Sequence, residues 1–488
     1  METKKCSPKK HALLSIITTL LITTGLLFSS LAPQLSYASS SVPEWGSLNG
    51  VADTTAYSTK HDYTNHISKV KDSSIFKTTY IDMRVTTLTT EVVHFNDAKL
   101  EAVIREAIKK PVGDITNQDL AGLIALAADQ EGILDLTGLE YAINLQTLTL
   151  CGNHIDDVTP LAGLTNLVML GLDDNQISDI SPLAGLTKLN TLWLDGNGIS
   201  NITPLAGLTD LEAVCISRNQ LSDISPLEGL INLLELWLVD NQISDIDTLA
   251  SLIELKYLYL DSNMITDISP LNGPNFTQLE VLSISNNRVS TVVSLANQEN
   301  LNDLYLTGNQ LSDIGFLTGL NNLELLYLDD NEITNIAPLA GLVSLKELKL
   351  NDNSITDISP LANLTNLYYL NLWSNKISDI YPLVVNSQQG GFGSENYLFL
   401  ENNYLNTAPG TKNMNDIQLL IDSGVEVSYL PQNSLTFGDV NCDGLVDILD
   451  LLWMAAKIGP SSIGPAWKAD VNNDGAVNIL DLLMVHES

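Results

Sequence analysis

Basic residues and aromatic residues are scarce in this chain of 488 residues. Lys and Arg number 23 against 58 Asp and Glu, which gives a formal net charge of −35. Binding to a nucleic-acid backbone needs clustered Lys and Arg, so this balance excludes it. Aromatic residues reach only 6%, whereas Leu, Asn and Asp are abundant, and this bias indicates internal repetition. With 44% hydrophobic residues, the chain is expected to fold.

The first 38 residues are predicted to be a secretion signal. Four lysines between residues 4 and 10 precede an apolar run over 12–28, and the small residues Ser36 and Ala38 fit a cleavage site. A single-pass anchor is the alternative, but the run is shorter than the ~20 residues of a bilayer span. Cleavage would change the net charge from −35 to −38, since residues 1–38 carry four Lys and one Glu. We expect a secreted product with no membrane span.

An asparagine recurs at a fixed spacing from residue 153 onward. The interval is 22 residues, apart from 24 before Asn287 and 28 before Asn403. The frame around it is L-x-x-L-x-L-x-x-N-x-[IL], with a Pro-Leu pair after most units. The twelve positions are Asn153, Asn175, Asn197, Asn219, Asn241, Asn263, Asn287, Asn309, Asn331, Asn353, Asn375 and Asn403. One unit cannot bury its own leucines, so we expect stacked units, a continuous core, and asparagines bonded to the backbone of the adjacent unit.

This frame resembles the leucine-rich repeat, and the 22-residue unit with its I-x-P-L-A-x-L segment is similar to the internalin type. The resemblance implies an α/β repeat solenoid with a parallel sheet on its concave face. The amphipathic pattern of residues 96–108, with Asn96 or Asp97 as N-cap, resembles the helical N-terminal cap of that family. After the array, a helix over 416–423 and a strand over 425–430 are expected to form a C-terminal cap.

The alternation of strand side chains separates core positions from concave positions. The leucines of the frame face the core and the residues between them face the concave surface. The aromatic residues at the concave positions are therefore expected to face solvent: Trp193, Trp237, Tyr257, Tyr259, Tyr305, Tyr327, Tyr369, Trp373, Tyr397 and Phe399. The acidic residues beside them, Asp173 and Asp195 among them, are expected to be solvated.

Exposed aromatic side chains in a row are costly unless they bind a ligand. The concave face would run ~55–60 Å at ~4.8 Å per strand, which suits a protein or a polysaccharide better than a metabolite. Stacking rings beside carboxylate acceptors would serve sugars or a basic protein. The alternative is a stripe that is tolerated through lateral stacking and binds nothing.

Two acidic loops, 31 residues apart, end the chain. Each has oxygen ligands at positions 1, 3, 5, 9 and 12, a glycine at 6, and a backbone carbonyl at 7, which suits a hard cation. The expected ligands of two Ca²⁺ ions are Asp439, Asn441, Asp443, Leu445, Asp447 and Asp450, and Asp470, Asn472, Asp474, Ala476, Asn478 and Asp481. The alternative is a pair of acidic turns that bind no metal.

The paired loops resemble a type I dockerin module, because position 12 is Asp and no helix enters either loop. The resemblance implies a small all-α domain that binds calcium and docks onto a cohesin-like protein. Loop positions 10 and 11, which carry recognition in that family, are apolar here, so the known specificities do not carry over. The expected partner-docking residues are Ile448, Leu449, Leu452, Trp453, Ile479 and Leu480. A self-contained calcium-folded cap is the alternative.

The sequence carries no catalytic motif. It lacks a nucleophile elbow, a zinc-protease motif and a phosphate loop. Three cysteines remain after signal cleavage, an odd number that does not make a disulfide framework. Cys151 and Cys215 lie three repeats apart, ~14 Å, beyond the ~7 Å Cα limit for a disulfide. No catalytic residue is therefore assigned.

These patterns predict a secreted, non-enzymatic protein that binds a protein or glycan and is tethered to an extracellular complex by the calcium module. The dockerin resemblance also implies an association with polysaccharide breakdown. The alternatives are an internalin-like adhesin whose terminal module is only structural, and a cryptic glycoside hydrolase. The expected organisation is a signal peptide (1–38), a Ser/Thr-rich extension (39–95), a helical cap with a first partial repeat (96–140), the solenoid (141–406), a C-terminal cap (407–431) and the dockerin-like module (432–488).

Overall fold

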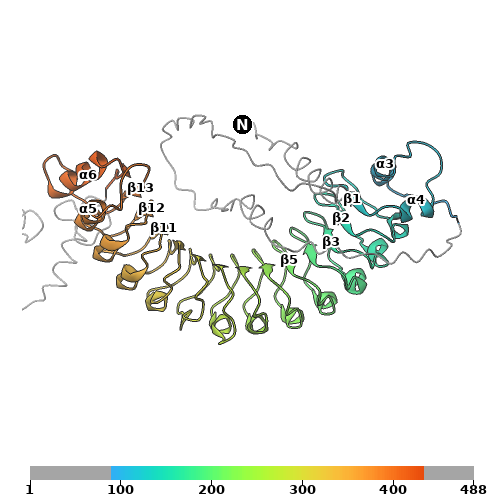
Figure 1. Ribbon diagram of the computed structural model, residues 1–488, viewed down its shortest axis with the longest axis horizontal. Coiled ribbons are helices and arrows are strands. Elements are labelled where there is room, and N and C mark those ends of the chain that lie inside the picture. The colour runs from blue at the N-terminus through green and yellow to red at the C-terminus, as the bar shows by residue number, and fades with distance from the viewer. Residues whose placement is uncertain (1–89, 433–488) are drawn as a thin grey trace, which may run out of the picture. The chain divides into compact units, whose positions relative to one another are not determined.

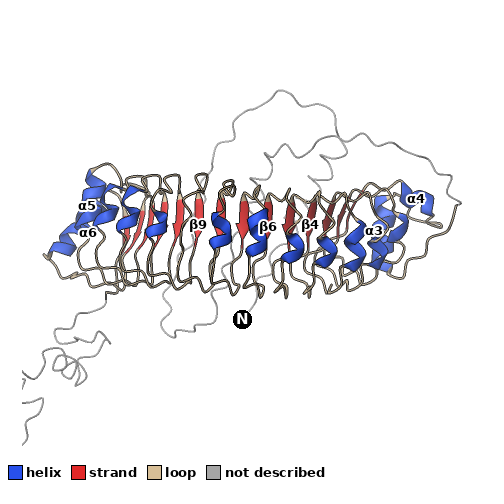
Figure 2. Cartoon of the chain, turned by 90° about the horizontal axis from the view of Figure 1, so that it is seen from below, coloured by secondary structure: helices blue, strands red, loops and turns tan. Residues whose placement is uncertain are grey.

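The computed structural model describes residues 90–432. Within this range one parallel sheet contains 14 strands in chain order, each three residues long, and Figures 1 and 2 show them side by side along the stack. The strands are β1 (Ala125–Ala127), β2 (Thr147–Thr149), β3 (Met169–Gly171), β4 (Thr191–Trp193), β5 (Ala213–Cys215), β6 (Glu235–Trp237), β7 (Tyr257–Tyr259), β8 (Val281–Ser283), β9 (Asp303–Tyr305), β10 (Leu325–Tyr327), β11 (Glu347–Lys349), β12 (Tyr369–Asn371), β13 (Tyr397–Phe399) and β14 (Glu426–Ser428). The predicted α/β repeat solenoid is confirmed.

In most repeats the opposite side returns through a short 3-10 helix, which lies on the outer side of the arc in Figure 1. These helices are η2 (Leu139–Tyr141), η3 (Thr159–Leu161), η4 (Ser181–Gly185), η5 (Thr203–Leu205), η6 (Ser225–Leu227), η7 (Asp247–Ser251), η8 (Ser269–Asn272), η9 (Gly315–Leu317), η10 (Ala337–Gly341) and η11 (Ser359–Asn363). Seven of them carry a proline in their first turn. Proline suits this position because its φ is already helical and its missing N–H is not needed there.

Among residues 90–432, four α-helices lie toward the two ends of the stack: α3 (Ala98–Ala107), α4 (Asn117–Ala121), α5 (Tyr381–Gln388) and α6 (Lys412–Asp422). Asp97 caps α3 as predicted, accepting hydrogen bonds from the N–H groups of Lys99 and Leu100. The helix expected over 416–423 begins earlier, because the Thr411 side chain caps it by accepting from Met414 N. The strand expected over 425–430 is likewise shorter, since β14 pairs with β13 over three residues only.

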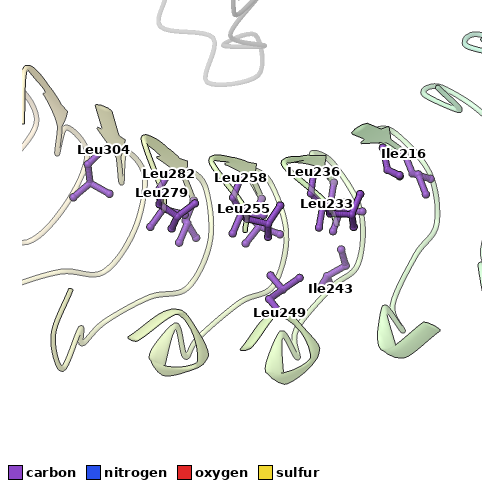
Figure 3. Close-up of a cluster of buried hydrophobic side chains, with 14 of the residues drawn as sticks. Ile216, Leu233, Leu236, Ile243, Leu249, Leu255, Leu258, Leu279, Leu282 and Leu304 are labelled. Carbon is purple, nitrogen blue, oxygen red and sulfur yellow. The ribbon is translucent and has the colours of Figure 1, made fainter. Parts of the chain in front are cut away.

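The core is a set of leucine and isoleucine ribs that run through all the repeats. Strand register places equivalent residues in line, so that Leu236 pairs with Leu258 and Leu258 with Leu282. All three are fully buried, and Figure 3 shows them beside the next rib, which includes Leu233, Leu255 and Leu279. Each buried leucine contributes ~1.5–3 kcal/mol of burial free energy, and only stacking buries it on both sides of the repeat.

The recurring asparagines join neighbouring repeats, as the sequence predicts. Asn263 shows the pattern: Nδ2 donates to the carbonyls of Leu260 (3.0 Å) and of Leu238 in the preceding repeat (2.9 Å), and Oδ1 accepts the N–H of Ile243 (3.0 Å). All twelve asparagines accept an N–H from the preceding repeat and donate to one of its carbonyls. They satisfy backbone groups that short strands leave unpaired.

Candidate functional site

The concave face is built from the first and third residue of every strand and the residue two positions after the third. The middle residue of each strand points into the core, for example Leu192, Leu236 and Leu326, all fully buried. Because every strand pairs in parallel with its neighbour, these positions form columns that run along the sheet. A residue in a column contacts the equivalent residues of the repeats on either side.

The expectation that the concave aromatics all face solvent is wrong for Tyr259 and Tyr305. Their side chains are 2% and 8% exposed. Tyr259 stacks on Trp237 with ring centroids 3.8 Å apart, and Tyr305 meets Tyr327 edge-on at 4.9 Å. Together with Val281 they form a second, smaller hydrophobic cluster. Strands only ~4.8 Å apart bring rings of one column into contact, so large rings cover each other's faces.

The exposed aromatic surface concentrates near the C-terminal end of the sheet. Trp373 is 38% exposed and Tyr397 is 41% exposed, while Tyr369 and Phe399 are half-buried with ring centroids 5.3 Å apart. Tyr368 (41% exposed) also belongs to this region, and the sequence analysis missed it. Its signal was the pair Tyr368–Tyr369, in which the first tyrosine lies beside the strand column.

The other two predicted aromatics, Tyr257 and Trp193, are half-buried. The Tyr257 hydroxyl donates to a Glu280 carboxylate oxygen at 2.9 Å. Trp193 lies across Gly171 of the preceding repeat: a Cβ atom at position 171 would lie 3.3 Å from an indole carbon. The absence of a side chain at Gly171 thus leaves room for the indole ring beside it.

The expectation of solvated acidic residues is wrong for Asp173 and Asp195. Each lies at the position that follows a strand and accepts a backbone N–H from the next repeat: Asp173 Oδ1 from Asp195 N (2.8 Å) and Asp195 Oδ1 from Ser217 N (2.6 Å). Burial raises the pKa of Asp173 to about 7, with the neighbouring Asp195 charge acting in the same direction. Burial likewise raises the pKa of Asp195 to about 6, and the Arg218 charge opposes part of that increase.

A lysine and several acidic residues surround Tyr327. The Lys349 ammonium lies 3.8 Å from the centroid of the Tyr327 ring. The Tyr327 hydroxyl donates to Glu347 Oε2 at 2.8 Å, and Tyr368 donates to the other oxygen of the same carboxylate. Burial raises the pKa of the Asp329 carboxyl, and the nearby Lys349 charge opposes that increase. This part of the concave face therefore already holds one cation between an aromatic ring and acidic residues.

Cys151 and Cys215 are free and half-buried on the concave side. Burial raises the pKa of both thiols, and the carboxylate of Asp173 acts in the same direction. A thiol with a raised pKa is a poor nucleophile, because little of it is present as thiolate. Among residues 90–432 there is no group of three or more His, Cys, Asp or Glu side chains that could hold a metal. Nor is any helix of this region long and apolar enough to cross a bilayer.

The calcium loops lie outside the described residues. This holds for all twelve predicted ligands, from Asp439 to Asp481, and for the six predicted docking residues, from Ile448 to Leu480. Their assignments stay predictions. The same is true of the signal peptide over 1–38.

Comparisons with known proteins agree with the fold. A family model described as "Leucine Rich repeats (2 copies)" matches nine windows from 143–185 to 343–384, and one described as "Dockerin type I domain" matches residues 437–488. An internalin from Listeria monocytogenes (InlF) is 32% identical, with a TM-score of 0.64 over 69% of this chain and 96% of that chain. The ectodomain of the plant receptor kinase GASSHO1/SCHENGEN3 from Arabidopsis thaliana is 22% identical, with a TM-score of 0.50 over 61% of this chain and 40% of that chain. A search of curated proteins found no match.

The chain belongs to the internalin-like leucine-rich repeat proteins and carries a C-terminal dockerin type I domain. Both predicted resemblances are confirmed. Leucine-rich repeats and dockerins are non-catalytic families, and type I dockerins bind calcium. The similarity to the plant receptor concerns the fold alone.

Proposed function

We propose that this protein is a secreted, non-enzymatic binding protein. Its concave face holds a macromolecular ligand, and its dockerin module attaches it to a cohesin-bearing extracellular complex. The observation that carries the proposal is the pairing, in one chain, of a repeat sheet with an aromatic and acidic concave face and a dockerin domain at 437–488. The first supplies a surface for recognition and the second a means of attachment.

The terminal loops have the donor chemistry that calcium requires. Each loop offers carboxylate and amide oxygens at alternate positions, and a glycine, Gly444 or Gly475, at position 6, where a calcium loop of this kind requires a sharp turn. Calcium would be held by the twelve residues from Asp439 to Asp481 named above, and it would order the loops by replacing repulsion among carboxylates with coordination. Seven of the eight acidic residues in 439–488 belong to this set.

Docking would follow from that ordering. The apolar pairs at Ile448–Leu449 and Ile479–Leu480 occupy equivalent positions of the two loops, so the module would have two related docking surfaces. A buried apolar contact of this kind depends on shape complementarity and tolerates no charge. The double substitution Ile448→Asp and Ile479→Asp should therefore abolish capture of the partner, whereas unchanged affinity would contradict the docking assignment.

Calcium dependence is tested on the mature chain, residues 39–488. Addition of Ca²⁺ should increase helicity and raise the melting temperature of the C-terminal transition, and a chelator should reverse both changes. The variant Asp443→Ala with Asp474→Ala is expected to lose the response, because each loop loses a central ligand. A response that persists in this variant would reject the ligand assignment.

A ligand-binding concave face separates this proposal from a purely structural solenoid. The exposed rings of Trp373 and Tyr397 offer stacking surface, and the length of a face built on 14 strands favours a macromolecule. An adhesin would share this face but would need no cohesin partner. A cryptic glycoside hydrolase would need a pair of catalytic carboxylates, and nothing observed in residues 90–432 favours that assignment over binding.

A further inference from the structure

The Lys349–Tyr327 contact indicates which ligand chemistry suits the concave face. The ammonium lies 3.8 Å above the ring centroid, and the ring hydroxyl is bonded to Glu347 at 2.8 Å. An aromatic face with a carboxylate beside it attracts cations more strongly where water is partly excluded. Here the chain supplies its own lysine.

An aromatic ring and carboxylates also occur together around Trp193, on the N-terminal half of the sheet. A ring carbon of Trp193 lies beside Gly171 of the preceding repeat, and the residues two positions after strands β3 and β4 are Asp173 and Asp195. Both carboxylates are half-buried and hydrogen-bonded to backbone N–H groups. The Trp193 ring and the two carboxylates belong to adjacent repeats, whose strands β3 and β4 pair directly.

The nearest cation already has another partner. The Arg218 guanidinium forms its ion pair with Asp174 at 2.8 Å. Its field acts on Asp173 and Asp195, but burial outweighs it, because both carboxyl pKa values stay raised. Two partly desolvated carboxylates on the same paired repeats as the Trp193 ring would be stabilised by an additional positive charge.

The wider charge of the repeats agrees with this. Residues 141–403 carry 31 acidic and 7 basic side chains, a net charge of −24. Such a surface steers cationic partners toward it. Neutral sugar hydroxyls could stack and accept or donate hydrogen bonds there, but they could not offset the charge.

We propose that the strip formed by Trp193, Asp173 and Asp195 binds lysine or arginine side chains of a basic protein partner. The inference rests on the proposed function of the concave face as a ligand-binding surface and names the chemistry of its ligand. The cation lies on the indole face and donates charge-assisted hydrogen bonds to the carboxylate oxygens of Asp173 and Asp195. Because the strip runs along the sheet from one repeat to the next, it would hold an extended basic segment of the partner.

The test uses the mature chain with two probes, a fluorescent decalysine peptide and a labelled xylohexaose. Asp173→Asn with Asp195→Asn keeps the oxygen that accepts each backbone N–H and removes two charges. The matched control is Asp156→Asn with Asp210→Asn, which removes two charges from exposed residues outside the strand columns. We expect the first pair and Trp193→Leu each to weaken decalysine binding at least tenfold, and the control to weaken it less than twofold.

Each outcome has a separate meaning. Equal weakening by both double variants would mean that the peptide senses only net charge, and it would overturn the inference. Suppose instead that Trp193→Leu abolishes xylohexaose binding but leaves decalysine binding unchanged. This result would overturn the inference and leave the proposed concave ligand surface intact. If neither probe responds to Trp193→Leu or to Trp373→Ala with Tyr397→Ala, the concave surface itself fails as a binding site. Melting curves confirm that each variant is folded.

Discussion

Substitution of one buried asparagine tests how the repeats are joined. Asn263 is 8% exposed, and its side chain bonds to Ile243 N and to the carbonyls of Leu238, Leu260 and Asp261. Each carbonyl has a second donor: the Asn241 amide for Leu238, the Asn287 amide for Leu260 and the Asp240 N–H for Asp261. In Asn263→Ala, therefore, only the Ile243 N–H loses its single side-chain partner, while each carbonyl keeps one bond.

The magnitude follows from these contacts. A buried N–H without a partner costs ~1–3 kcal/mol, and each hydrogen bond lost from a carbonyl that keeps another costs ~0.5–1.5 kcal/mol. Asn263→Ala should thus lower the free energy of unfolding by about 2.5–7.5 kcal/mol. Asn263→Asp should lower it further, because a buried carboxylate oxygen would face three carbonyl oxygens in place of the donating amide group.

The assay is urea unfolding of the mature chain, followed by circular dichroism. A solenoid unfolds as coupled repeats, so a weakened junction should also broaden the transition. The control is Asn232→Ala, an exposed asparagine outside the strands whose amide donates to Thr209 O at 2.9 Å; it should cost less than ~1 kcal/mol. Equal losses for Asn263→Ala and Asn232→Ala would refute the role assigned to the ladder.

Three further predictions follow from the concave face. The pKa of Asp173 is raised from 3.8 to about 7, so its contribution to stability is complete below pH ~4 and is lost as the pH rises through 7. Asp173→Asn should therefore raise the melting temperature relative to wild type more at pH 8 than at pH 5. An equal difference at both pH values would contradict the raised pKa. Gly171→Val should displace the Trp193 ring and cost ~1–3 kcal/mol through overcrowding, visible as a shift of tryptophan emission, whereas an unchanged spectrum would contradict the contact. Tyr259→Ala should destabilise by ~3 kcal/mol or more because it opens a cavity beside Trp237, while the exposed Tyr397→Ala should cost under ~1 kcal/mol in the same melting assay; similar losses would show that both tyrosines are equally buried.

The features that repeat along the sequence were predictable. The 22-residue period, the leucine positions and the prolines of the 3-10 helices depend on local pattern and on neighbours one period away, both of which the sequence displays. The role of Asn263 could be predicted for the same reason, since a buried amide at a fixed turn position has only backbone groups to bind. Asp97 as the cap of α3 depends on a local signal too.

The features that depend on contacts along a column were not predictable from one repeat. Tyr259 is buried because Trp237 lies on the preceding strand and Val281 lies on the following strand, in the next column. Strand alternation alone had assigned the rings of Trp237 and Tyr259 to solvent. Asp173 is half-buried in a column of the sheet, where its carboxylate accepts the N–H of Asp195 from the next repeat. Its place within one repeat indicated only a polar surface position. The start of α6 depends on the Thr411 cap, which the hydrophobic pattern over 416–423 did not include.

The account as a whole depends on attachment through the dockerin module. The most direct measurement is affinity capture from culture medium of the producing organism with the mature chain as bait, in Ca²⁺ and in chelator, with captured proteins identified by mass spectrometry. The account predicts a cohesin-containing protein that is captured in Ca²⁺, released by chelator and absent with the Ile448→Asp and Ile479→Asp bait. Capture of no such protein in Ca²⁺, or capture that chelator and the double substitution leave unchanged, would contradict it.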